Sequence, residues 1–282
     1  MTPEEGRVAG SDGTALAVRR WKGTGGVAFL LVHGLASNAR LWDGVATRLA
    51  ARGYGVTAID QRGHGRSDKP DHGYDFATVT ADLVAAIDAL GLDRPVVAGQ
   101  SWGANVALDL AAHHHGVARG VACVDGGWID LRRFATWDDC AAAMAPPTIA
   151  GTPLRQVEEY LRRAHPDWPP EGIAGTLANF EVRPDGTVAP RLTLERHLAI
   201  LRALWEHRPA ELYPLVDVPV LLVPCDDGTA WTDEKRRQVA AAEAGLARSR
   251  TAWFRADHDV HAQHPGEIAD LLAGCAEEGF WP

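Results

Sequence analysis

The 282-residue chain has little of what metal-binding, redox and disulfide-stabilised proteins need. Its four cysteines (Cys123, Cys140, Cys225 and Cys275) lie far apart and form no CxxC pair, so the sequence predicts reduced thiols and a cytoplasmic location. The histidine triplet at 113–115 does not indicate a metal site, because adjacent helical residues point about 100° apart and cannot converge on one ion. We therefore expect no bound metal.

The chain also lacks an excess of positive charge. Its 28 Lys and Arg residues stand against 37 Asp and Glu residues, which gives a formal net charge of −9. An acidic chain without a basic block lacks the electrostatic footprint of a nucleic-acid-binding protein. No apolar run approaches membrane-spanning length, and the stretch MTPEEGRVAG has no signal-peptide pattern. We expect neither nucleic acid nor membrane as a partner, and the sequence leaves the oligomeric state open.

What the sequence does contain is a regular alternation of strand-length apolar runs with helical segments. The run VAFLLVHG (27–34) is too short for a helix and suits a parallel strand buried on both faces. The segment ALAVRRW (15–21) is expected to form an edge strand. Further strands are expected at 55–60, 94–99 and 117–125. The alternation predicts an α/β fold with a mostly parallel, doubly wound sheet and crossover helices on both faces.

This alternation stops after Asp125 and resumes at the apolar run VPVLLVPC. Between residues 127 and 212 no buried strand is evident, tryptophans and prolines are frequent, and Asp185-Gly186 indicates a short hairpin. We therefore expect one core domain, formed by residues 1–126 and 213–282, that is interrupted by a mostly helical cap domain at 127–212.

The stretch VVAGQSWGANVAL (96–108) places Ser101 between Gly99 and Gly103, where a buried strand should turn into a helix. In a G-x-S-x-G turn of this kind the serine hydroxyl stands above the edge of the sheet. The glycines matter because a side chain at either position would collide with the neighbouring strand or helix. The pentapeptide alone is a weak signal, since small residues also form ordinary tight turns, but the flanking strand and helix are the context that a nucleophile requires.

Three further segments accompany this serine in the order found in the α/β-hydrolase fold family. LLVHGLASNARLW (30–42) resembles the oxyanion loop of that family, and DQRGHGRSDKP (60–70) resembles its D-x-R-G-x-G-x-S segment. DHDVHAQHP (257–265) resembles the loop that carries the catalytic histidine. The resemblance covers most of the chain outside 127–212 and is specific for the fold, but it is far less specific for the substrate.

The resemblance implies that Ser101 attacks a carbonyl carbon while a histidine accepts its proton and later passes it to the leaving group. His258 lies seven residues before Pro265, which is the spacing of the catalytic histidine in this family, and His261 is the alternative. The backbone N–H groups of Leu35 and Trp102 are the implied donors to the developing oxyanion. His33 and His64 are expected to brace these loops.

The acid of the implied triad is open to two assignments. Members of the family most often carry it in a turn after the penultimate strand, where Asp226 and Asp227 lie. Another branch carries it after the strand that follows the serine helix, where Asp125 lies 24 residues beyond Ser101. An aspartate there can also be a cap or a turn residue. We expect Asp125, with Asp226 as the alternative acid.

A serine nucleophile implies acyl transfer, and without a GxGxxG motif no nicotinamide cofactor is expected. We expect a cofactor-independent serine hydrolase that cleaves a carboxylic ester or lactone of a hydrophobic or aromatic small molecule through an acyl-enzyme. Trp128, Trp137 and Trp205 are candidate substrate-binding residues, although they could equally form the core of the cap. The alternatives are a C–C bond hydrolase of ring-cleavage products, a cofactor-free haloperoxidase, or a slow-turnover small-molecule sensor of the same fold.

Overall fold

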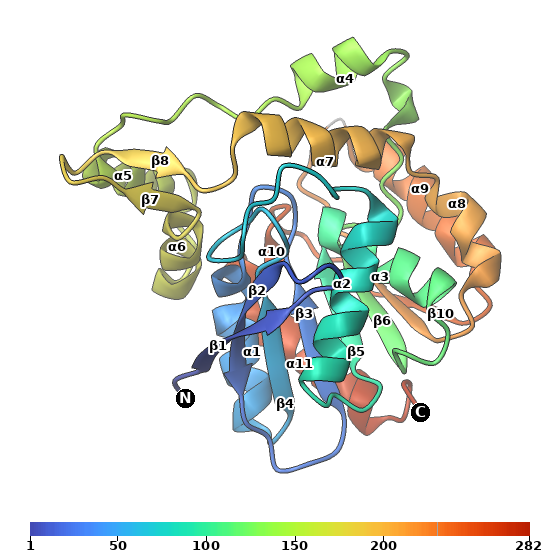
Figure 1. Cartoon of the computed structure of the whole chain (residues 1–282). Helices are drawn as coiled ribbons and strands as arrows, with labels where there is room; N and C mark the ends of the chain where they lie inside the picture. Colours follow the sequence, from blue (N-terminus) through green and yellow to red (C-terminus); the bar gives the residue numbers. More distant parts are fainter. Residues whose placement is uncertain (230) are drawn as a thin grey trace.

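The computed structural model describes residues 1–229 and 231–282, and a central sheet dominates it (Figure 1). The sheet has eight strands in the order β1-β2-β4-β3-β5-β6-β9-β10. The six strands from β4 to β10 in this order run parallel, and β1 and β2 form an antiparallel hairpin at one edge. The strands are β1 (Glu4–Ala9), β2 (Ala15–Trp21), β3 (Ala28–Val32), β4 (Gly55–Ile59), β5 (Val96–Gln100), β6 (Gly120–Val124), β9 (Val220–Val223) and β10 (Ser249–Thr251). The predicted α/β class and mostly parallel sheet are confirmed.

The prediction that residues 15–21 form the edge strand is wrong. Residues 4–9 pair with them in antiparallel register, from Glu4 opposite Arg20 to Ala9 opposite Ala15, and so β1 is the edge. Five of the six residues of β1 are exposed, so hydrophobic periodicity gives no signal for this strand. Its charged side chains also suit an edge strand, because they discourage pairing with another chain.

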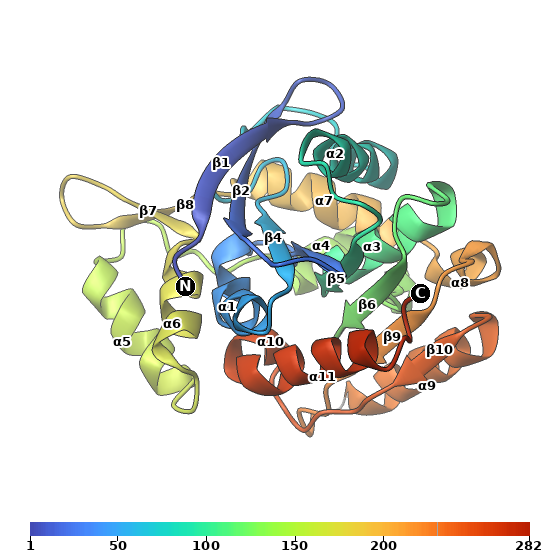
Figure 2. The ribbon, with the colours of Figure 1, turned by 90° about the horizontal axis from the view of Figure 1, so that it is seen from below.

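Helices cover both faces of the sheet (Figure 2). On one face lie α1 (Asp43–Ala51) and α11 (Pro265–Glu277), and on the other lie α2 (Phe76–Ala89) and α3 (Trp102–His113). Side chains of β3 alternate between the two layers: Phe29 and Leu31 belong to the buried cluster with α1 and α11, and Leu30 and Val32 to the cluster with α2 and α3. Both faces of the strand are buried, which explains the continuous apolar run in the sequence.

The segment between β6 and β9 is mostly helical, as predicted. In Figure 1 helix α7 crosses above the sheet, and α5, α6 and the small hairpin stand to one side. The hairpin has its turn at Asp185-Gly186, as the sequence predicts. The elements are η2 (Leu131–Arg133), α4 (Trp137–Ala143), α5 (Leu154–Ala164), α6 (Pro170–Leu177), β7 (Phe180–Val182), β8 (Val188–Pro190), α7 (Leu194–Glu206), α8 (Pro209–Leu212) and η3 (Tyr213–Leu215). The division into a core and a cap domain at residues 127 and 212 stays a prediction.

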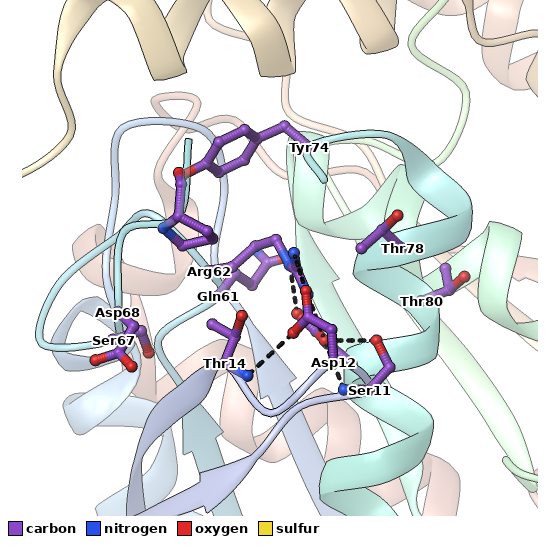
Figure 3. Close-up of polar contacts among 12 residues, drawn as sticks. Ser11, Asp12, Thr14, Gln61, Arg62, Ser67, Asp68, Tyr74, Thr78 and Thr80 are labelled. Atoms are coloured by element: carbon purple, nitrogen blue, oxygen red, sulfur yellow. Dashed lines mark hydrogen bonds and ion pairs between the residues drawn. The ribbon is translucent and has the colours of Figure 1, made fainter. Parts of the chain in front are cut away.

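A buried ion pair holds the loop that follows β4. Arg62 is fully buried and donates to both carboxylate oxygens of Asp82 on α2, at 2.6 and 2.8 Å. Its guanidinium also lies 3.2 Å from Asp12, and Figure 3 shows Asp12 and Thr14 of the β1–β2 turn beside it. Although burial opposes the charge, hydrogen bonds to the two carboxylates raise the pKa of Arg62 above its ordinary value. The loop is thereby tied to α2 and to the edge hairpin.

Candidate active site

Ser101 joins β5 to α3 in a strained backbone conformation, with φ of 54° and ψ of −125°. The flanking glycines permit this turn. A Cβ atom on Gly99 would lie 2.1 Å from the carbonyl oxygen of Gly103, and one on Gly103 would lie 2.3 Å from the carbonyl oxygen of His33. Backbone segments can pack this closely only without side chains at these two positions. The turn places Ser101 at the N-terminus of α3, at the carboxyl edge of the sheet.

The side chains of Ser101, His258 and Asp125 form a continuous hydrogen-bonded chain. His258 Nε2 lies 2.9 Å from Ser101 Oγ, and His258 Nδ1 lies 2.6 Å from Asp125 Oδ2. The neighbouring strands β5 and β6 end just before Ser101 and Asp125, so the fold brings these residues to one edge. Gln100 donates its amide to the carbonyl oxygen of His258 at 3.1 Å, which holds the histidine loop against the serine turn. The three side chains have the geometry of a nucleophile, a base and a group that orients the base.

The carboxylate of Asp125 is buried and fully hydrogen-bonded. Besides its contact with His258, Asp125 Oδ1 accepts from the backbone N–H of Cys225 at 2.9 Å, and Oδ2 accepts from Lys235 Nζ at 2.9 Å. Burial disfavours the ionised form, but the hydrogen bond and charge of His258, together with Lys235, lower the pKa of Asp125 below its ordinary value. Asp125 is therefore ionised at neutral pH.

The alternative acid is held elsewhere. Asp226 accepts from the backbone N–H of Gly228 at 3.0 Å and from Thr232 Oγ1 at 3.2 Å, and it pairs with Arg236 at 2.9 Å. Its neighbour Asp227 accepts from the backbone N–H of Thr229. Across residues 1–229 and 231–282, neither aspartate makes a hydrogen bond to His258. The structure thus brings Asp125, and not Asp226, to the histidine.

His261 is likewise not placed at the serine. It is fully buried and packs against Trp42, with ring centres 4.3 Å apart. Burial lowers the pKa of His261 to about 3, so the ring is neutral. For His258, whose side chain is 51% exposed, desolvation by the surrounding protein also opposes the charge, but the hydrogen bond and charge of Asp125 outweigh it, and the pKa of His258 lies above its ordinary value. Only His258 combines contact with Ser101 and contact with a carboxylate among the residues described.

The backbone N–H groups of Leu35 and Trp102 flank Ser101. Leu35 follows Gly34, where an added Cβ would lie 3.0 Å from Ser101 Cβ, so this loop packs directly on the nucleophile. Trp102 is the first residue of α3, where backbone N–H groups have no partner within the helix. In the described part of the chain neither N–H has a hydrogen-bond acceptor. Two free donors beside a serine hydroxyl are what an oxyanion hole requires.

Two buried histidines hold this loop in place. His33 Nε2 accepts from the backbone N–H of Gln61 at 3.0 Å, and His64 Nε2 accepts from the backbone N–H of Ala36 at 3.3 Å. Their ring centres are 4.8 Å apart. Burial holds the pKa of His64 well below its ordinary value, so the ring is neutral and can accept this hydrogen bond. Through these contacts the two histidines hold the Leu35 loop and the loop after β4 together.

Ser101 and His258 open on two unequal cavities. The larger has a volume of about 470 Å³ and the smaller about 150 Å³. About half of the side chains that line the larger cavity are apolar, among them Trp128, Ile129, Leu131, Leu201 and Leu204, although most of its exposed lining surface is apolar. The polar side chains include Asp130, Arg133, His197, Glu234 and Lys235. The smaller one is lined by Leu35, Leu41, His165, Trp168, Thr176, Asn179 and Asp259 among others. A further cavity of about 640 Å³, between the edge hairpin and α6, contains neither Ser101 nor His258.

Of the three tryptophans predicted to bind substrate, the structure brings Trp128 to the larger cavity. Trp137 and Trp205 instead pack on each other, with ring centres 6.2 Å apart, and the guanidinium of Arg202 lies over both rings. Trp205 also donates to the carbonyl oxygen of Phe134 at 3.3 Å. These two rings pack between α4 and α7 and line neither of the two cavities at Ser101, so substrate binding by Trp137 and Trp205 stays a prediction.

No sequence motif marks Lys235, which contacts Asp125 in the structure. This residue is 110 positions from Asp125 in the chain and lies in the charged run TDEKRRQ, where nothing distinguishes one lysine from its basic neighbours. The contact depends on how α9 (Thr232–Gly245), which packs on α8 and β10, is placed relative to Asp125 at the end of β6. Local sequence carries no signal for it.

Within residues 1–229 and 231–282, no helix has the length and apolar character needed to cross a membrane. Over the same residues, no three His, Cys, Asp or Glu side chains lie together as potential metal ligands.

Comparison with known proteins gives the family and the fold. A sequence model described as the alpha/beta hydrolase fold matches residues 27–147. The chain is 31% identical over 250 residues to 2-(acetamidomethylene)succinate hydrolase of Mesorhizobium japonicum, covering 86% of this chain and 81% of that protein. The crystal structure of E-2-(acetamidomethylene)succinate hydrolase matches with a TM-score of 0.79 and 24% identity, over 96% of this chain and 98% of that one. A non-heme chloroperoxidase of Streptomyces lividans is 40% identical over 98 residues, which is 35% of this chain and 36% of that protein.

Proposed function

Because the chain belongs to the α/β-hydrolase fold family, we propose that it is a serine hydrolase that cleaves a carboxylic ester or lactone of a small hydrophobic or aromatic molecule through an acyl-enzyme. The hydrogen-bonded chain from Ser101 through His258 to Asp125 is the observation that carries this proposal. The exposed surface of the larger cavity is mostly apolar, which supports the hydrophobic substrate class.

The proposed reaction begins when Ser101 Oγ attacks the carbonyl carbon and His258 Nε2 takes the hydroxyl proton. Asp125 accepts from Nδ1–H, which fixes the tautomer of the ring and stabilises the imidazolium that forms. The oxyanion of the tetrahedral intermediate is bound by the N–H groups of Leu35 and Trp102. His258 then protonates the leaving alkoxide, and an ester remains on Ser101. Water, deprotonated by the same histidine, attacks this ester and releases the acid.

The two cavities divide the substrate at the scissile bond. Since Ser101 lines both, the acyl group and the leaving group occupy different cavities, and the bulkier of the two occupies the larger one. A substrate that is bulky on both sides has no room on the side of the smaller cavity. We therefore propose a substrate with one bulky, mainly apolar part and one small part.

An amide is the second candidate substrate class. The relative from Mesorhizobium japonicum is named for a substrate that carries an acetamido group. The same acyl-enzyme route serves an amide, since His258 can protonate a leaving nitrogen as well as an oxygen. The C–C bond hydrolase and the slow-turnover sensor are the alternatives, and both predict little or no turnover of the esters and the anilide named below.

A fluorophosphonate is expected to label Ser101 covalently, and the activity lost should equal the fraction of the protein that is labelled. His258→Ala should slow this labelling about 100-fold or more, because the hydroxyl then lacks its general base. The matched control is His261→Ala, which removes a nearby histidine without contact to Ser101 and should leave the labelling rate within about threefold of wild type at a temperature below its Tm. Peptide mass spectrometry locates the label. Labelling of another residue, or equal loss in both variants, contradicts the assignment.

The division of the cavity predicts a preference among simple esters. We expect kcat/KM for 4-nitrophenyl acetate to exceed that for 4-nitrophenyl decanoate about tenfold or more, because the decanoate is bulky on both sides of the scissile bond. Initial rates of nitrophenol release measure this preference, and 4-nitroacetanilide tests the amide in the same assay. A preference for the decanoate would show that the smaller cavity does not limit the substrate.

A further inference from the structure

Helix α9 brings a lysine into direct contact with the acid of the proposed triad. Lys235 Nζ lies 2.8 Å from Asp125 Oδ1 and 2.9 Å from Oδ2, and it donates to the carbonyl oxygen of Cys225 at 2.7 Å. The Asp125 side chain is 0% exposed and that of Lys235 is 16% exposed, so water screens this ion pair only weakly. The carboxylate thus contacts both an ammonium group and the ring of His258, and its Oδ2 atom bonds to both.

We propose that Lys235 is a positioning residue of the reaction: through Asp125 it limits how tightly His258 holds its proton and so sets the lower end of the pH range of activity. This inference rests on the proposed serine hydrolase function. Lys235 has no role in the bond-making steps, since Asp125 stands between it and the histidine.

The physical basis is the sharing of one negative charge. An ionised carboxylate beside a histidine favours the protonated ring, which cannot accept the proton of Ser101. An ammonium group on the same carboxylate repels the protonated ring and weakens that effect. Consistent with this, Asp125 raises the pKa of His258 and Lys235 lowers it, while the net pKa stays above the ordinary value.

The other ionisable groups around His258 and Asp125 supply no comparable cation. Asp259, on the histidine loop, raises the pKa of His258, although burial raises the pKa of Asp259 itself. His261 is neutral, and burial raises the pKa of the Cys225 thiol so that it stays protonated. More distant ionisable groups that line the cavities are Asp130, Arg133, His165, His197, Asp227 and Glu234. Within the described residues, Lys235 is the one fixed cation in hydrogen-bonding contact with the triad.

The same contact also fastens α9 to the core, and a purely structural role must be separated from the electrostatic one. Loss of a fastening contact lowers Tm but leaves the ionisation of His258 where it was. Loss of the ammonium charge moves that ionisation. The sign follows from the geometry: without Lys235 the full charge of Asp125 acts on the ring, the pKa of His258 rises, and the neutral base needed for catalysis forms only at higher pH.

The test is the pH dependence of kcat/KM for 4-nitrophenyl acetate in wild type, Lys235→Met, Lys235→Gln and Lys235→Arg. We expect kcat/KM to rise with pH as His258 loses its proton, and we call this part of the profile the acidic limb. In the two neutral variants the midpoint of the acidic limb should lie about one pH unit higher than in wild type. At a pH well below this midpoint, kcat/KM of the neutral variants is then about tenfold lower than that of wild type. Lys235→Arg keeps the charge and should retain the wild-type limb. Lys235→Gln covers the case in which Lys235→Met does not fold.

A readout independent of turnover keeps the two proposals apart. The titration of the His258 ring, followed by NMR with labelled histidine, should show the same upward shift in the neutral variants whether or not the ester is a substrate. An unshifted His258 titration in Lys235→Gln, with only a lower Tm, would overturn the role of Lys235. A wild type that titrates as expected but hydrolyses no acyl substrate would instead overturn the proposed function.

Discussion

Ser101→Ala is expected to lower kcat about 10⁴-fold or more and to leave Tm within about two degrees of the wild-type value. The hydroxyl is the atom that forms the acyl-enzyme, so no other side chain replaces it. Its side chain makes one hydrogen bond, to His258 at 2.9 Å, at the junction of two cavities, and losing it opens no hole in the core. Alanine adopts the strained φ of 54° at about the same energetic cost as serine, because both residues carry a Cβ atom. Ester turnover and thermal unfolding of the purified variant measure the two effects.

The matched control is Ser249→Ala, which makes the same chemical change on β10, away from the cavities that Ser101 lines. It should keep wild-type kcat. If Ser101→Ala retained a tenth or more of the activity, another group would be the nucleophile and the acyl-enzyme route through Ser101 would have to be abandoned.

Asp125→Asn is expected to lower kcat about 10³- to 10⁴-fold with a smaller effect on KM. The asparagine keeps the shape of the side chain but removes the charge that stabilises the imidazolium, and its amide can present a donor to His258 Nδ1 and favour the wrong tautomer. It also leaves Lys235 without its partner carboxylate, so Tm should fall. Kinetics are therefore compared at a temperature at which both proteins remain folded.

Asp226→Asn is the decisive comparison for this prediction, because the sequence allowed either aspartate. Asp226 bonds to Gly228, Thr232 and Arg236 and not to His258, so its variant should keep kcat within about threefold of wild type. A large loss of kcat in Asp226→Asn with a small loss in Asp125→Asn would show that Asp226, in the turn after β9, is the acid of the triad.

Much of the fold could be predicted because its causes are local. The central strands are buried on both faces, so their apolar runs are continuous, and Gly99 and Gly103 mark a turn that tolerates no Cβ atom. Strand β1 was not predicted, because its residues are exposed and show no hydrophobic pattern. Backbone hydrogen bonds to β2 hold it in the sheet. The edge position assigned to β2 was wrong for the same reason.

The candidate site could be predicted only in part. Ser101 and His258 follow from local motifs and spacing, and the structure places them 2.9 Å apart. The acid does not follow, because β6 and β9 are neighbours in the sheet and an aspartate after either strand reaches the same edge. Whether Trp128, Trp137 or Trp205 lines a cavity depends on which face of the helical segment 127–212 packs inward. An aromatic side chain suits a cavity wall and a packed interior equally well, so the residue type does not decide between them.

The sequence by itself therefore determined the parallel sheet, the serine turn, the histidine that follows the last strand and the mostly helical segment between residues 127 and 212. These features depend on hydrophobic periodicity and on backbone conformations that single residues control. Only the tertiary structure decided that Asp125 meets His258, that Trp137 packs on Trp205, and that Lys235 pairs with Asp125. Each of these depends on side-chain directions between residues 68 to 133 positions apart in the chain, which packing sets and local sequence does not encode.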